Sequence, residues 1–151
     1  MLSHSKTVFA IALATSCAAV AAAPAGSSAI AARKANFKEI GGSFKAINDE
    51  IKSGALDLNS LRPSARDLAS RATASLKHFP KGSGPQAGKT RAKAILWTQY
   101  AEFTQLQKQL VAQTAALSAA AAGGKVAELA AASKMVGATC KSCHDKFRET
   151  E

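Results

Sequence analysis

The chain has 151 residues, of which 47% are hydrophobic, a composition typical of one domain with a single core. It excludes a large multidomain enzyme and a wholly disordered chain. The 20 Lys and Arg residues against 10 Asp and Glu residues give a formal net charge of +10. Such a charge favours an acidic partner, an anionic cofactor or a nucleic acid. Three cysteines are too few for a scaffold held together by disulfides.

Residues 1–23 are predicted to be a secretory signal peptide that is cleaved from the mature chain. A weakly basic start precedes an almost unbroken apolar run from Val8 to Ala23, and small residues at 21–25 offer the cleavage site. No second hydrophobic segment follows, so cleavage is favoured over a retained membrane helix. We therefore expect residues 24–151 to work in the periplasm without a membrane span.

Two amphipathic helices are predicted in the first half of the mature chain, because apolar residues recur there at steps of three and four. The first helix begins near Ile30 and ends at Ser53-Gly54, where glycine accepts the left-handed conformation of a helix C-terminus. The second runs from Leu58 to Leu76 and is stopped by Phe79-Pro80.

The second half of the chain repeats this arrangement after a loop, residues 81–88, that is rich in glycine and proline. A third helical stripe occupies residues 89–120 and is broken by Gly123-Gly124, and a fourth begins at Lys125. No segment alternates as a strand does. The predicted fold class is therefore all-α, an antiparallel up-down-up-down four-helix bundle.

The fourth helix carries the motif Cys-Lys-Ser-Cys-His at residues 140–144, which is the attachment pattern of a c-type haem. Two thiols add across the vinyl groups of haem, and the histidine that follows coordinates the iron. On a helix, Cys140 and Cys143 are one turn apart and His144 follows Cys140 by four residues, so the three share a face. We expect one covalently attached haem c with His144 as the iron ligand.

Three other interpretations of Cys140 and Cys143 are open. A disulfide between them would be strained in mid-helix. A structural zinc site needs four ligands, and beyond the motif only His78 and scattered carboxylates are available. A redox-active dithiol normally lies where a strand leads into a helix, and this pair lies well along a helix.

The chain resembles the cytochrome c′ family, the four-helix-bundle class of c-type cytochromes, from about Ala32 to Arg148. The resemblance rests on residues 33–45, on 79–84 together with 93–97, and on the haem-binding end at 136–148. The last segment is the most specific, because ordinary small cytochromes c carry their motif near the N-terminus. The family's fold is an up-down-up-down bundle. Homodimers are common in the family, so the resemblance implies a homodimer, with the first helix as a candidate contact.

The resemblance also implies roles for three residues around the haem. Low-spin relatives use a first-helix methionine as sixth iron ligand, and Phe37, which has no lone pair to give, occupies the matching position. This implies a five-coordinate, high-spin iron with Phe37 over its open face, in a dry pocket that admits nitric oxide or carbon monoxide. Arg33 is expected to pair with a haem propionate, and Arg148 to lie near the proximal imidazole.

Each of these residues also has an ordinary structural interpretation. Phe37 would then be a core residue of the first helix, and Arg33 a solvated cation near a helix start. Arg148 would complement the negative end of the helix dipole. Trp97 and Tyr100 are expected to fill the core or to abut the cofactor.

We therefore expect a non-enzymatic haem protein that carries electrons and binds small diatomic gases. The main alternative is a low-spin electron carrier whose sixth ligand is His78 or another side chain, and a third is a bundle without haem. Lysines spread over all four helices without interleaved aromatics argue against nucleic-acid binding and favour steering of an acidic redox partner.

Overall fold

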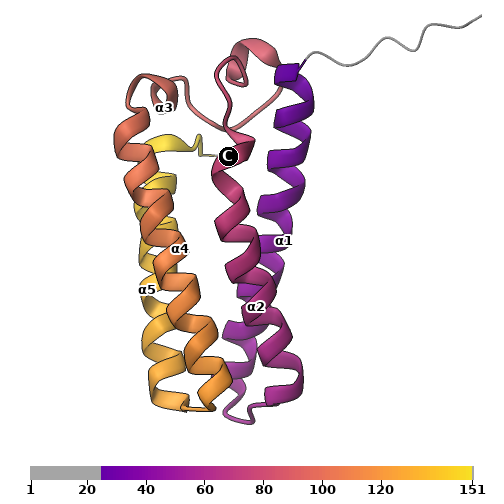
Figure 1. Ribbon diagram of the computed structural model, residues 1–151, viewed down its shortest axis with the longest axis vertical. Helices are drawn as coiled ribbons and strands as arrows, with labels where there is room; N and C mark the ends of the chain where they lie inside the picture. The colour runs from indigo at the N-terminus through magenta and orange to yellow at the C-terminus, as the bar shows by residue number, and fades with distance from the viewer. Residues whose placement is uncertain (1–24, 151) are drawn as a thin grey trace, which may run out of the picture.

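The computed structural model describes residues 25–150 and is a bundle of four long helices (Figure 1). The long helices are α1 (Ala25–Ser53), α2 (Leu58–Ser75), α4 (Tyr100–Gly123) and α5 (Val126–Phe147). Three short elements lie in the connection from α2 to α4: η1 (Leu76–His78), η2 (Pro85–Ala87) and α3 (Ile95–Thr98). The predicted all-α bundle is confirmed. The predicted signal peptide lies outside the described residues, and within them no helix is long and apolar enough to span a membrane.

The ends of the long helices follow the predicted glycine positions. Gly54 after α1 and Gly124 after α4 have φ values of 71° and 68°, in the left-handed region that favours glycine. Asp57 caps α2 by accepting a hydrogen bond from the Asn59 backbone N–H at 2.9 Å. The start of α1 at Ala25, rather than near Ile30, is a correction. Ala and Ser residues extend the helix upstream of Ile30, where the apolar stripe used for the prediction begins.

The third predicted helix begins later than expected. Residues 89–94 are not helical, because the chain pairs there with the C-terminal segment: Lys93 N–H donates to Phe147 O (2.9 Å) and Glu149 N–H donates to Arg91 O (2.8 Å). Helix then forms as the single turn α3 and is interrupted at Gln99 before α4 begins. A long-range backbone pairing, which periodicity cannot reveal, therefore replaces the first turns of the predicted helix.

The four long helices do not pack equally closely. α1 packs on α2, α2 on α4, and α4 on α5, whereas α1 and α5 make few contacts with each other. Figure 1 shows α1 beside α2 and α4 beside α5 along their lengths. The core is built from apolar side chains that are almost completely buried, among them Ile47, Leu61, Leu68, Leu117 and Leu129. The loose contact between α1 and α5 leaves room for a large group on that side of the bundle.

Candidate functional site

A cavity of about 690 Å³ lies between α1 and α5, with walls from every long helix and from the connection between α2 and α4. Its interior is mainly apolar, with Ile40, Leu68, Leu106 and Val136 among its lining side chains. The six side chains predicted to hold or cover a cofactor all line it: Arg33, Phe37, Cys140, Cys143, His144 and Arg148. Residues more than a hundred positions apart in sequence therefore meet at one site.

The haem-attachment motif lies on the last turns of α5 and faces this cavity. Cys140 and Cys143 are half-buried and are not joined to each other by a disulfide. Val136 precedes Cys140 by one turn and is fully buried, so the same apolar stripe that packs α5 into the bundle carries the cysteines to the cavity wall.

The electrostatics of the two thiols argue against a redox dithiol. Burial raises the pKa of Cys140, and burial together with the neighbouring Cys140 raises the pKa of Cys143 to about 11. Both groups therefore stay protonated near neutral pH, whereas a reactive dithiol needs a lowered pKa. A structural zinc site also has no basis in residues 25–150, where no three His, Cys, Asp or Glu side chains gather in a metal-binding group.

The surroundings of His144 favour the neutral form of its imidazole. Burial lowers the pKa of His144 below its ordinary value of 6.5, and the charges of Arg148 and Arg91 lower it further. A neutral imidazole offers a nitrogen lone pair, so the surroundings favour a ligand role. Arg148 follows His144 by one turn, and its backbone N–H donates to the His144 carbonyl oxygen at 3.0 Å.

An unbroken row of aromatic rings crosses the cavity wall from α1 to α5. The ring centroids of Phe37 and Phe79 are 5.9 Å apart, those of Phe79 and Phe103 4.6 Å, and those of Phe103 and Phe147 5.6 Å. Phe79, Phe103 and Phe147 are buried and Phe37 is half-buried. Edge-on and tilted contacts of this kind stabilise aromatic side chains in fixed orientations.

Arg33 lies on α1, and its side chain is almost completely buried at 4% exposure. The guanidinium donates to the carbonyl oxygen of His78 and to the hydroxyl and carbonyl oxygens of Ser83. It also donates to the hydroxyl oxygen of Thr90. The structure therefore excludes the solvated cation that was the ordinary interpretation, while pairing with a propionate stays a prediction.

Gln107 of α4 was missed by the sequence analysis, although it lines the cavity. Its side chain is 4% exposed, its carbonyl oxygen accepts a hydrogen bond from the Ser75 hydroxyl, and it hydrogen-bonds the Cys143 thiol. The sequence does carry a signal, since this polar residue stands four positions after Phe103 and three before Leu110 on the apolar stripe. A buried polar residue on such a stripe needs partners, which the site provides.

The other side chains considered for the site lie apart from it. His78 does not line the cavity, and Met135 is 51% exposed on α5. Tyr100 is 39% exposed, so the core position predicted for it is wrong. Trp97 is half-buried, and its indole N–H donates to the carbonyl oxygen of Pro80 at 3.1 Å.

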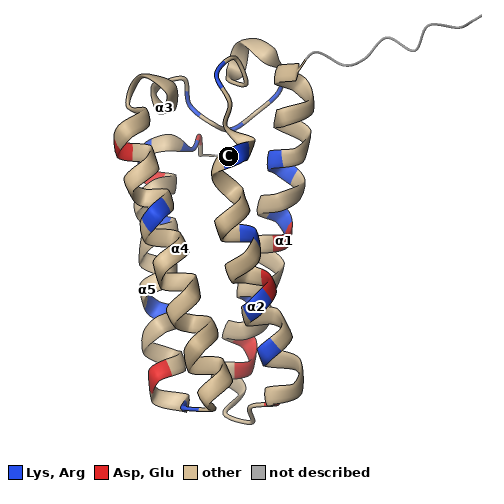
Figure 2. Cartoon of the chain, viewed as in Figure 1, with Lys and Arg blue, Asp and Glu red and all other residues tan. Residues whose placement is uncertain are grey.

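The charged side chains around the cavity have one sign. Lys34, Lys38 and Lys89 line it together with Arg33, Arg91 and Arg148, and no Asp or Glu of the described residues 25–150 does. Elsewhere both signs are interspersed, and Figure 2 shows basic and acidic residues distributed along the helices of the bundle. The cavity therefore combines an apolar interior with a cationic edge.

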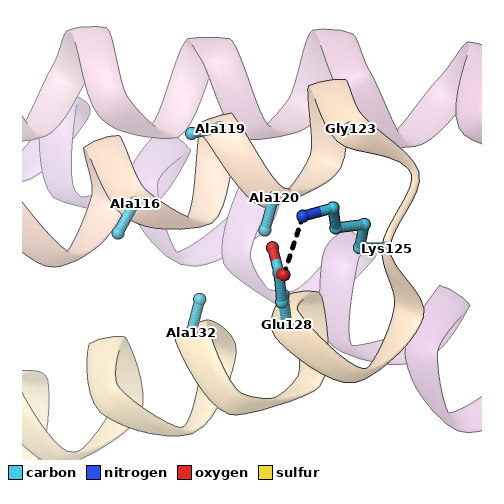
Figure 3. Close-up of a pocket in the computed structure, with 7 residues that line it drawn as sticks. All are labelled: Ala116, Ala119, Ala120, Gly123, Lys125, Glu128 and Ala132. Atoms are coloured by element: carbon cyan, nitrogen blue, oxygen red, sulfur yellow. Dashed lines mark hydrogen bonds and ion pairs between the residues drawn. The ribbon is translucent and has the colours of Figure 1, made fainter.

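A second hollow of about 390 Å³ lies at the turn between α4 and α5, at the other end of the bundle (Figure 3). Its walls are mostly alanines, with an ion pair between Lys125 and Glu128 at 2.9 Å. It contains no cysteine, histidine or aromatic side chain. The candidate site is therefore the larger cavity.

The residues of the larger cavity fit a covalently attached haem c. The cysteines and the histidine are spaced for two thioether bonds and one iron ligand on the same helix face. The apolar interior suits the macrocycle, and the cationic edge suits its two carboxylates.

Comparison with known sequences gives a consistent result. A sequence model of the family described as cytochrome C′ matches residues 28–148. A cytochrome c′ from Pararhodospirillum photometricum is 35% identical over 118 residues, which cover 78% of this chain and 93% of that protein. A cytochrome c′ from Rhodospirillum rubrum is 31% identical over 137 residues and covers 91% of both chains.

Solved structures agree with the sequence relatives. The crystal structure of cytochrome c′ from Thermochromatium tepidum has a TM-score of 0.78 and 28% identity, covering 85% of this chain and all of that chain. The nitric oxide complex of a cytochrome c prime point mutant from Alcaligenes xylosoxidans has a TM-score of 0.76 and 26% identity. The match covers 83% of this chain and 97% of that chain. The chain therefore belongs to the cytochrome c′ family, whose members bind a covalently attached haem c.

Proposed function

We propose that this protein is a periplasmic, high-spin, monohaem cytochrome that binds small diatomic gases and exchanges single electrons, rather than an enzyme. When bound, haem c supplies an iron that changes between the ferric and ferrous states and that takes nitric oxide or carbon monoxide as a ligand. The observation that carries the proposal is the composition of the cavity wall. Among residues 25–150, His144 is the only histidine that lines the cavity and no methionine does, and Phe37 lies on the helix that faces α5 across it.

The chain's own residues divide the work at this site. Cys140 and Cys143 would retain the prosthetic group, and His144 would supply a nitrogen ligand to its iron. Phe37 covers the cavity from α1 with a ring that has no lone pair, so water and anions find no polar partner beside it. A small apolar gas needs no such partner and enters when the ring gives way.

Carbon monoxide association with the ferrous protein tests this role of Phe37. The Phe37→Ala variant removes the covering ring and is expected to bind carbon monoxide at least about ten-fold faster in flash photolysis, a change that corresponds to about 1.4 kcal/mol of barrier. Ile51→Ala is the control, because Ile51 is a half-buried apolar residue of the same helix that lies outside the cavity lining. Equal rates in wild type and Phe37→Ala would contradict a covering role.

The cationic edge of the cavity supports electron exchange with an acidic redox partner. Opposite charges steer encounter, and the effect weakens as salt screens it. A Lys34→Glu, Lys38→Glu variant is expected to exchange electrons more slowly with an anionic oxidant such as ferricyanide at low salt. Lys108→Glu, Lys134→Glu makes the same change in net charge on α4 and α5, away from the cavity lining, and is expected to have a smaller effect. Equal slowing in both variants would rule out local steering.

Periplasmic location and a homodimer are further parts of the proposal. The apolar segment that starts the sequence supports export. α1 is open at Gly42, which lies outside the cavity lining and where an added Cβ would meet nothing within 4 Å, and this part of the helix is a candidate for the contact with a second copy. Sedimentation of the exported protein tests the dimer, and a monomer at high protein concentration would contradict it.

A further inference from the structure

Arg33 joins α1 to three points of the connection between α2 and α4. Its Nη1 atom donates to His78 O at 3.1 Å and to Ser83 Oγ at 3.2 Å. Its Nη2 atom donates to Ser83 O and to Thr90 Oγ1, both at 2.9 Å. Ser83 is itself completely buried, and its hydroxyl donates to Pro80 O at 2.8 Å. One buried guanidinium therefore fixes residues 78–90 against α1.

The same guanidinium also fixes an aromatic ring of the cavity wall. Its central carbon lies 4.8 Å from the centroid of Phe79 and 5.7 Å from that of Trp97, so two aromatic side chains hold it as a cation–π contact. The edge of Phe79 in turn meets Phe37 at 5.9 Å between centroids. Contacts thus run without a gap from Arg33 through Phe79 to the ring that covers the cavity.

We propose that Arg33 and Phe79 form a latch that holds Phe37 over the cavity and so sets how readily a gas enters. The inference rests on the proposed function, because it concerns the residue assigned there to the open side of the iron. Arg33 is a positioning residue in this role and acts through Phe79. A planar guanidinium is required, because only this group can give four hydrogen bonds in a fork while stacking on a ring.

The Arg33→Lys variant distinguishes the latch from a simple charge pair. Arg33→Lys keeps the positive charge but loses the fork and the planar stack, so the latch fails in this variant, whereas pairing with an anionic group would largely survive. Arg33→Met keeps the packing volume without the charge. Thr90→Val removes a single acceptor and is the milder variant if the others fold poorly. Arg62→Met is the matched control, because Arg62 also donates to carbonyl oxygens, those of Ala121 and Ala122, outside the cavity lining.

Two measurements on the haem-loaded protein test the latch. The first is hydrogen exchange of the backbone amides of residues 79–90, expected to be about ten-fold faster or more in Arg33→Lys and Arg33→Met, and to rise less in Thr90→Val. The second is the carbon monoxide association rate, expected to rise several-fold in the same variants. Phe79→Leu separates the two links, because it keeps the hydrogen bonds of Arg33. In Phe79→Leu we expect the carbon monoxide association rate to rise while the backbone amides near Ser83 remain protected from hydrogen exchange.

Several outcomes would overturn the proposal. Wild-type exchange and wild-type gas rates in Arg33→Lys would show that charge alone matters. Faster amide exchange in residues 79–90 with an unchanged carbon monoxide rate in the Arg33 variants would show that Arg33 does not act on Phe37, provided that Phe37→Ala binds carbon monoxide faster than wild type. If Phe37→Ala also binds at the wild-type rate, the covering role in the proposed function fails and the latch fails with it. The two kinds of failure are therefore distinguishable.

Discussion

Phe37 is the side chain on which the proposed chemistry of the site depends. It lines the cavity from α1, while His144 lines it from α5. A thioether at this position would offer a sulfur lone pair where the phenyl ring offers none. In this proposal, phenylalanine at position 37 leaves the site open to gases, whereas a thioether there would close it.

The Phe37→Met variant is expected to convert the protein to a six-coordinate, low-spin form. Its ferrous optical spectrum should show sharp, split bands in place of broad ones, and its carbon monoxide association rate should fall at least about ten-fold, since the new ligand must leave first. Ile51→Met places the same side chain on α1 outside the cavity lining and should keep the wild-type spectrum. A broad spectrum in Phe37→Met would mean that Phe37 does not face the iron.

Sequence and structure differ in what they reveal about single residues. The cysteines and His144 were predictable because their chemistry requires a fixed local spacing. The partners of Arg33 and Gln107 were not, because they lie 45 to 57 residues from Arg33 and 32 from Gln107 along the chain. In the sequence, only the position of a polar residue on an apolar stripe could have pointed to Gln107.

At the scale of elements, a polar contact on the surface joins α1 to α2. The carboxylate of Asp67 accepts hydrogen bonds from Arg71 Nε and, across the helix pair, from Ser43 Oγ at 2.7 Å. Hydrogen bonds from Arg71 and then Ser43 hold the pKa of Asp67 below its ordinary value of 3.8. The contribution to stability is therefore present above pH 3.8 and is lost as the pH falls through the lower folded-state pKa.

Asp67→Asn is expected to lower the thermal midpoint at pH 7 by about 2 °C, a small effect because both side chains of the pair remain partly exposed to solvent. The difference from wild type should shrink as the pH falls below about 4 and vanish when the wild-type carboxylate is protonated. Thermal unfolding across a pH series measures it. Asp49→Asn, in the exposed pair with Lys45, should change the midpoint less. A difference that grows towards low pH would contradict the assignment.

Helix order and most helix ends followed from periodicity and glycine positions, but the starts of the first and third segments did not. The third segment was predicted to be helical from residue 89, and helix begins at Ile95. The apolar stripe begins only at Leu96, and residues 89–94 contain neither glycine nor proline that would mark a boundary. The boundary is set by backbone pairing with the residues around Phe147, which are distant in sequence and close only in the folded bundle.

For the whole molecule, the loose contact between α1 and α5 suggests that the prosthetic group is part of the core. Periodicity predicted four helices, but it could not show which pair separates to make room. A large cavity costs stability when it is not filled, so anything that binds there stabilises the fold.

The Cys140→Ser, Cys143→Ser double variant tests this coupling. Haem held only by His144 should be extracted by acidified organic solvent, and the thermal midpoint should fall by at least about 5 °C. Ser142→Ala, between the two cysteines on the exposed side of α5, is the control and should retain its haem. An unchanged midpoint in the double variant would show that the bundle is stable without its attached group.

The most direct test of the account is the optical spectrum of the exported, wild-type protein in the ferric and ferrous states, before and after carbon monoxide is added. We expect a covalently bound chromophore with a broad, high-spin Soret band that sharpens with the gas. Sharp, split ferrous bands in the resting protein, or no visible absorption, would contradict it.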